Sequence, residues 1–201
     1  MNHRVNNVQQ LYDDANSLYN NVVLGTADII INDLSQGITT LKSCWEGKDA
    51  GVQIQNVVEV YNAMVVIRNA LSELAKSSTS IAANYRDIQN ANRANLETLT
   101  PISIDNKNIM EDYSDNRDSI NITSEAMVGK NKIDAANNSI STFVSEVQKY
   151  YDMIMNNWQS GTGRESAEQA FSDFMSKANK YKETLGQVSQ SITDAIKNYT
   201  Y

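Results

Sequence analysis

An apolar stripe at alternating spacings of three and four residues leads to Trp45, and this spacing is what most constrains the fold. Such a spacing places side chains along one seam of an α-helix. Beyond the turn "WEGKDAG" the stripe resumes with the same rhythm. The sequence therefore predicts two long helices joined by a turn, each burying its seam. The seam residues are Ala27, Ile31, Leu34, Ile38 and Leu41 before the turn, and Val57, Val60, Met64, Ile67, Leu71 and Leu74 after it.

The same design recurs in the second half of the chain, 113 positions later. Trp158 corresponds to Trp45, and apolar or aromatic residues again occupy the seam. Beyond the turn the offset becomes 114, so Gly161 corresponds to Gly47 and the turn "WQSG" is one residue longer. Both copies also close on Asn-Tyr, at residues 84–85 and 198–199. Helical hairpins commonly share a seam, but the added agreement of tryptophan, glycine and Asn-Tyr indicates a duplication.

Trp45, Gly47, Trp158 and Gly161 are the candidate site residues, as turn motif and partner contact. Glycine permits the backbone angles that a tight turn needs, and Asp49 is expected to cap the helix that follows. Two interpretations of the tryptophans stay open. Each indole is a hydrophobic plug at the end of its hairpin, or a partly exposed anchor for a partner.

The 201 residues divide into a first hairpin at 1–97, a connecting segment at 98–130 and a second hairpin at 131–201. The connecting segment holds the single proline and a group of acidic residues. It is predicted to be a solvated acidic linker with one short helix near 119–128. Two hairpins can close into an all-α four-helix bundle within one chain, or each can pair with a second copy in a homodimer. We favour the antiparallel bundle within one chain.

Composition disfavours several classes of partner. The formal net charge is −7 and no run of basic residues exists, which argues against nucleic acid and against membrane surfaces. The apolar runs are too short to insert into a membrane. The first residues lack the apolar core of a signal peptide. The chain is therefore expected to be made in the cytoplasm and, if exported, to leave by a route that reads no such signal.

No catalytic, cofactor-binding or metal-binding residue is predicted. His3 is the only histidine, so Ser/His/Asp and Cys/His constellations lack a base. Cys44 is the only cysteine and has no partner for an internal disulfide. The acidic residues between 105 and 118 lack the glycine of a calcium loop. The prediction is a protein that is not an enzyme and needs no cofactor.

Trp45-Glu46-Gly47, set between two long heptad helices, resembles the Trp-x-Gly turn of the WXG100 (ESAT-6-like) family. The resemblance covers about residues 5–95 and 130–201, and the second copy departs from the motif by its extra residue. The usual family member is one hairpin of about half this length that dimerises into an antiparallel four-helix bundle. The resemblance thus implies a tandem version, similar to such a dimer fused into one chain.

The resemblance also implies a function. The family is exported by type VII (ESX-like) secretion systems of Gram-positive bacteria, as substrates or as escorts of larger effectors. The implied partners are a helical protein or effector and the secretion ATPase, and the implied location is outside the cell. The family's Tyr-x-x-x-Asp/Glu export signal is not matched after the first hairpin, where Gln89 follows Tyr85 by four positions. The alternative is a structural bundle protein of a phage or cell surface with no role in secretion.

Overall fold

The computed structural model describes residues 5–158 and 162–199. Its first helical rod is built from α1 (Val8–Ser17), the π-helix η1 (Leu18–Ala27) and α2 (Asp28–Cys44), which follow one another without a break. The short strand β1 (Trp45–Glu46) makes the turn. Helix α3 (Lys48–Ala91) then runs back along the rod.

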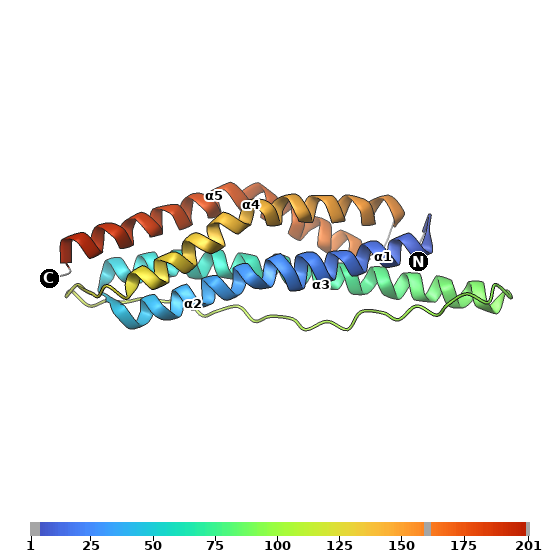
Figure 1. Ribbon diagram of the computed structural model, residues 1–201, viewed down its shortest axis with the longest axis horizontal. Coiled ribbons are helices and arrows are strands. Elements are labelled where there is room, and N and C mark those ends of the chain that lie inside the picture. Colours follow the sequence, from blue (N-terminus) through green and yellow to red (C-terminus); the bar gives the residue numbers. More distant parts are fainter. Residues whose placement is uncertain (1–4, 159–161, 200–201) are drawn as a thin grey trace.

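The second hairpin follows an extended crossing. Residues 92–125 return along the outside of the bundle and include the strand β2 (Asn121–Ile122). Helix α4 (Ala126–Asn157) and helix α5 (Thr162–Tyr199) then complete the fold. In Figure 1 the chain ends N and C lie at opposite ends of an elongated bundle. The predicted short helix near 119–128 is wrong as a separate element, because that stretch contains β2 and the start of α4.

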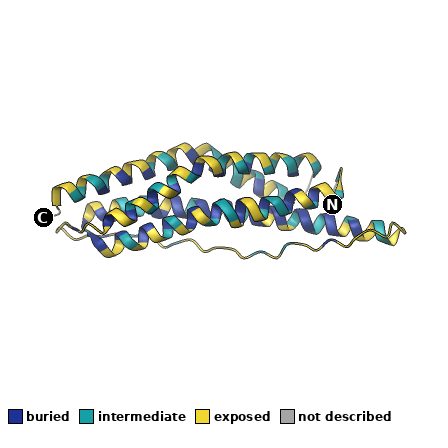
Figure 2. Cartoon of the chain, in the orientation of Figure 1, coloured by how far each residue is buried: buried dark blue, intermediate teal, exposed yellow. Residues whose placement is uncertain are grey.

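The two hairpins pack against each other along their lengths. The rod α1–η1–α2 lies against both α3 and α4, and α5 lies against α4 and α3. This arrangement confirms the all-α fold of two helical hairpins in a bundle. Burial follows the seams, as the dark stripes of Figure 2 show. The fully buried seam residues include Leu34, Leu41, Met64, Leu71, Ile140, Ile154, Leu185 and Ile192.

Two glycines let α2 and α4 approach closely at the point where the rod meets the second hairpin. A Cβ atom added at Gly37 would lie 3.1 Å from Ile133 Cγ1 and 3.2 Å from the Gly129 carbonyl oxygen. A Cβ added at Gly129 would lie 3.0 Å from two side-chain carbons of Leu41. The backbones therefore meet where neither residue carries a side chain.

The π-helix η1 was not predicted from the seam. Its buried residues are Leu18, Val22, Val23 and Ala27. The four-residue spacings from Leu18 to Val22 and from Val23 to Ala27 also suit an α-helical face, so the apolar pattern does not distinguish a π-helix here. Two polar bonds tie this stretch to α4. Thr26 Oγ1 donates to Glu146 Oε2 at 2.5 Å, and Asn21 Nδ2 donates to Tyr150 Oη at 2.9 Å.

The segment between the hairpins is held against the bundle in a fixed register. We call residues 97–118 the strap. Three side chains of α3, Gln55, Asn62 and Asn69, form what we call the amide ladder along it. Asn62 accepts the Met110 N–H at 2.7 Å and donates to the Met110 carbonyl at 3.0 Å. Asn69 makes the same two bonds to Lys107, at 3.0 and 2.8 Å.

The amide ladder works because two repeats have the same length. Its members are seven residues apart, which is about 10 Å along a helix at about 1.5 Å per residue. Their partners Tyr113, Met110 and Lys107 are three residues apart, which is also about 10 Å in an extended chain at about 3.3 Å per residue. Gln55 completes the series by accepting the Tyr113 N–H at 2.7 Å. Side chains of α3 therefore hydrogen-bond the backbone of the strap, while most of the strap's own side chains face solvent.

Candidate functional site: the two tryptophan turns

Trp45 ends the first rod by turning its backbone to an extended conformation. Its φ and ψ are −135° and 122°, and its N–H still donates to the Leu41 carbonyl. Trp45 then pairs with Ile122 in the two-stranded β1–β2 ribbon. The Thr123 N–H donates to the Cys44 carbonyl at 3.0 Å. The first turn is thereby joined to the segment that leads into α4.

Trp158 ends α4 in the same way. Its φ and ψ are −124° and 110°, and its N–H donates to the Ile154 carbonyl at 2.9 Å. It forms an antiparallel bridge with Val5. The Asn6 N–H donates to the Asn157 carbonyl at 3.1 Å. Each tryptophan thus pairs with the segment that enters the first helix of the other hairpin, and the two ends of the bundle repeat one pattern.

Both indoles are buried: Trp45 is 2% exposed and Trp158 is 1% exposed. A buried aromatic ring at each end closes the core of the bundle there. Any partner that uses these residues must therefore approach an edge of the ring and cannot cover its face. Their role in binding a partner stays a prediction.

Gly47 has a conformation that only glycine adopts readily. Its φ is 115°, and an added Cβ would lie 2.8 Å from the Ser119 carbonyl oxygen. Its N–H donates to Asp115 Oδ2 at 2.9 Å. Gly161, its counterpart in the second copy, lies outside the described residues.

Three charged residues hold the strap onto the first turn, and we call Glu46, Asp115 and Arg117 the clasp. Arg117 bonds the Glu46 carboxylate at 2.6 Å and the Asp115 carboxylate at 2.6 Å. The Arg117 guanidinium, and after it the Gly47 N–H, lowers the pKa of Asp115 well below its usual range. Gly51 permits the close approach, because an added Cβ would lie 2.6 Å from the Asp115 nitrogen.

The second turn is held by different residues. Arg164 donates to the Trp158 carbonyl at 2.8 Å and to Glu168 Oε1 at 2.8 Å. Nearby, the ring of Tyr151 stacks on Phe171 with centroids 4.4 Å apart. Burial, followed by the charge of Glu168, raises the pKa of Tyr151 to about 12.

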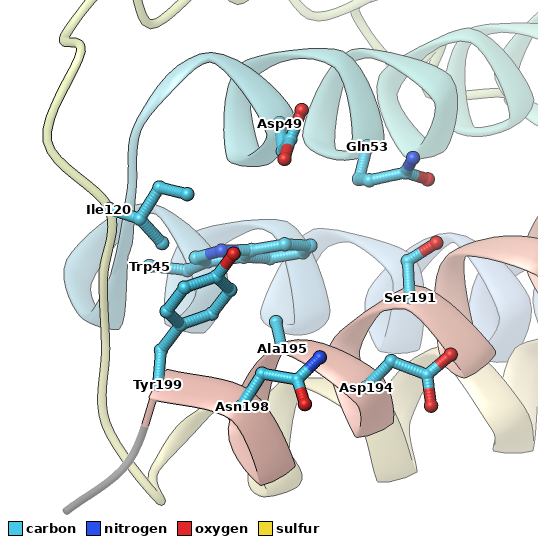
Figure 3. Close-up of a pocket in the computed structure, with 9 residues that line it drawn as sticks. All are labelled: Trp45, Asp49, Gln53, Ile120, Ser191, Asp194, Ala195, Asn198 and Tyr199. Carbon is cyan, nitrogen blue, oxygen red and sulfur yellow. The ribbon is translucent and has the colours of Figure 1, made fainter.

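A pocket lies beside Trp45, at the end of the bundle where α5 finishes; we call it the end pocket (Figure 3). Its volume is about 300 Å³. The start of α3 contributes Asp49 and Gln53, the crossing segment contributes Ile120, and the last turns of α5 contribute polar side chains that include Asp194 and Tyr199. Asp49 does not cap α3 as expected. It lies inside the first turn, after the N-cap Gly47, which makes no side-chain cap bond.

The Trp45 indole nitrogen is buried at the end pocket without a hydrogen-bond partner among the described residues. Figure 3 shows the ring between the start of α3 and the last turns of α5, with its nitrogen on the side of Ile120 and Tyr199. Most buried donors in proteins are hydrogen-bonded, so an unsatisfied one is a feature to explain.

The sequence offered two further reactive residues, His3 and Cys44, and the described ranges group no catalytic or metal-binding side chains with them. His3 lies outside those ranges. Cys44 is buried, and burial, with a smaller contribution from Glu125, raises the pKa of its thiol. Over residues 5–158 and 162–199, no three histidine, cysteine or acidic side chains are grouped to hold a metal ion. Within the same part of the chain, every helix is too short or too polar to cross a membrane.

Comparison with known proteins gives one match. The family model described as "WXG100: Proteins of 100 residues with WXG" matches residues 119–201, which include the second hairpin. No curated protein and no solved structure matches the chain. The matched copy is the one whose turn carries the additional residue.

Proposed function

We propose, from the match of the WXG100 family model to residues 119–201, that the whole chain is a non-enzymatic helical protein of a type VII (ESX-like) secretion system. In this proposal it is either a secreted substrate or an escort that carries a larger effector by helix–helix packing. Trp45, Glu46 and Gly47 of the first hairpin resemble the family's turn motif. In this proposal the first hairpin is therefore also a WXG100-like unit, and the protein is a tandem of two such units.

One observation carries the proposal: the two turns repeat one backbone pattern at opposite ends of the bundle. Trp45 pairs with Ile122, and Trp158 pairs with Val5. The hairpin matched by the family model and the unmatched hairpin are therefore built alike. A two-copy chain of this design has the form of a dimer fused into one molecule.

Because the core of the bundle is filled, the surfaces left for a partner lie on the outside of the bundle. The seams of both hairpins are buried within one chain, so a partner is expected to bind an outer helix face or a bundle end. Trp45, Gly47, Trp158 and Gly161 are proposed to shape those ends for the partner. The partner is an effector, a helical protein or the secretion ATPase.

Export from the natural host tests the proposal. An epitope-tagged chain is compared in wild-type cells and in cells that lack the secretion ATPase, with a cytosolic protein as the control for lysis. A substrate is found in the medium of the wild-type cells alone. An escort that stays inside is captured together with an effector. Equal amounts in both media, or absence from both with no captured effector, contradicts the proposal and favours a structural assembly protein.

A further inference from the structure

The end pocket carries a second inference, which rests on the proposed function and gives its partner a chemistry. We propose that the end pocket binds a basic segment of a partner protein. A carbonyl oxygen of that segment accepts the Trp45 indole N–H, and a lysine or arginine side chain lies against Asp49 and Asp194.

The indole N–H specifies the first half of the ligand. Trp45 is 2% exposed, and its nitrogen has no acceptor among the described residues. Leaving such a donor unsatisfied destabilises the folded chain, because the donor loses its hydrogen bonds to water and gains none in return. An amide carbonyl that enters the pocket removes this cost. The indole N–H has no acceptor function, so the ligand atom it meets must be an acceptor.

The carboxylates specify the second half. Asp49 and Asp194 both line the end pocket, and neither forms an ion pair with a residue of the described ranges. Two cations near this end are bound elsewhere, since Lys48 pairs with Asp118 and Arg117 belongs to the clasp. Lys197, one turn after Asp194 in α5, forms no ion pair with either carboxylate in the described ranges. A cation from outside therefore meets two carboxylates that no cation of the described chain neutralises.

The remaining walls suit the stem of a basic side chain. Ile120 is 38% exposed and Tyr199 is 47% exposed, so an aliphatic stem and a cation over an aromatic ring both find contacts. A volume of about 300 Å³ is at the small end of ligand pockets, which suits one side chain with its peptide unit. The net charge of −7 also attracts a basic partner over distance.

The two tryptophans allow a direct test in the intact chain, because each gives one indole N–H signal in a heteronuclear NMR spectrum. The signals are assigned with the variants Trp45→Phe and Trp158→Phe. The probe is the peptide acetyl-Gly-Arg-Gly-amide at millimolar concentration. The Trp45 signal is expected to shift and saturate, and the Trp158 signal, at the far end of the bundle, is expected to stay.

Matched probes and variants separate the two halves of the ligand. Citrulline in place of arginine keeps the shape and removes the charge, and it is expected to bind several-fold more weakly. Propylguanidinium keeps the charge and removes the carbonyl, and it is expected to leave the Trp45 signal nearly unmoved. Asp49→Asn and Asp194→Asn are each expected to weaken the binding of the arginine peptide by about two- to fivefold. Asp87→Asn, an exposed carboxylate far along α3, is the control.

Three results overturn the proposal: no shift of the Trp45 signal, equal shifts of both indole signals, or equal binding of the citrulline peptide. These results leave the proposed function standing if export still needs the ATPase. Conversely, the chain could bind the arginine peptide and yet never be exported and capture no effector. That result would support the proposal for the end pocket and contradict the proposed role in secretion.

Discussion

Trp45 and Trp158 end their helices with nearly the same backbone angles and lie at opposite ends of one bundle, because Trp45 follows the end of the rod and Trp158 pairs with Val5 at its start. Each is joined by backbone hydrogen bonds to the chain segment that enters the other hairpin. The hairpins are therefore bound at both ends as well as along their seams. A chain closed in this way has satisfied within itself the pairing that a single hairpin needs from a second copy.

The first prediction follows from that closure. The chain is expected to be a monomer in dilute solution, with a mass near 22.4 kDa, because both seams are buried internally. Size-exclusion chromatography with light scattering measures this mass. A stable dimer that persists on dilution would show that the hairpins pair between chains.

A second prediction concerns the close contact of α2 and α4. Gly37→Ala is expected to destabilise the bundle by about 1–3 kcal/mol, because its Cβ would press on Ile133 and on the Gly129 carbonyl. Gly186→Ala is the matched control in α5, where an added Cβ meets only Asn137 Nδ2 at 4.0 Å. That change is expected to stabilise the protein by about 0.5–1 kcal/mol, as alanine is the better helix former. Urea unfolding gives both values, and equal signs would refute the contact.

The third prediction tests the amide ladder. Asn62→Ala and Asn69→Ala each remove two hydrogen bonds to the strap, and each is expected to cost about 1–3 kcal/mol. Hydrogen exchange gives the local result, since the Met110 and Lys107 amides lose their acceptors and should exchange faster. Asn84→Ala, at an exposed position of α3, controls for the change in helix propensity. Unchanged exchange at both amides would mean that the strap is held by other contacts.

The fourth prediction concerns the pH dependence of the clasp. The folded state lowers the pKa of Asp115, so the unfolded state binds more protons at acidic pH. The stability that Asp115 contributes is thus fully present above its unfolded pKa of about 3.9 and is lost as the pH falls toward its folded pKa. Asp115→Asn is expected to be less stable than the natural chain at neutral pH, and the difference should shrink below about pH 4.

Urea unfolding of both chains at a series of pH values measures this difference. Asp118→Asn is the control, because Asp118 pairs with Lys48 while both side chains are largely exposed to water. A difference between the natural chain and Asp115→Asn that does not change with pH would show that the carboxylate charge is not what holds the clasp.

The fifth prediction lies at the alkaline end. Folding raises the pKa of Tyr151 to about 12, above its ordinary value of about 10. The folded state thus keeps a proton that the unfolded state releases, so stability falls as the pH rises from about 10 to about 12. Tyr151→Phe keeps the stacking on Phe171 and removes the titrating hydroxyl. It is expected to lose less stability than the natural chain over this range, and an identical loss would refute the shift.

The seams and the turns were predictable because their signals are local. An apolar residue every three or four positions defines a helix face. A glycine such as Gly47 indicates a positive φ angle, which other residues rarely adopt. The closure of four helices followed from the need to bury two such seams. That Gly51 serves close approach to Asp115 was not predictable, because the approaching segment lies more than sixty positions away.

The strap and the end pocket depend on contacts that no local pattern reports. Gln55, Asn62 and Asn69 occupy polar heptad positions, which a periodicity argument assigns to solvent. Their spacing of seven has meaning only once an extended chain with a repeat of three lies beside them. The end pocket likewise joins Trp45 to Tyr199, which are brought together by the antiparallel packing of α3 and α5. Residue patterns within one helix carry no information about such neighbours.

The register of the strap reverses the usual expectation about where a sequence tolerates changes of length. Loss or gain of one residue between Lys107 and Tyr113 would move a backbone amide away from at least one of its side-chain partners in α3. The two turns, in contrast, already differ in length by one residue. Among relatives of this chain, the stretch that looks most like a loop should keep its length, and the second turn should vary.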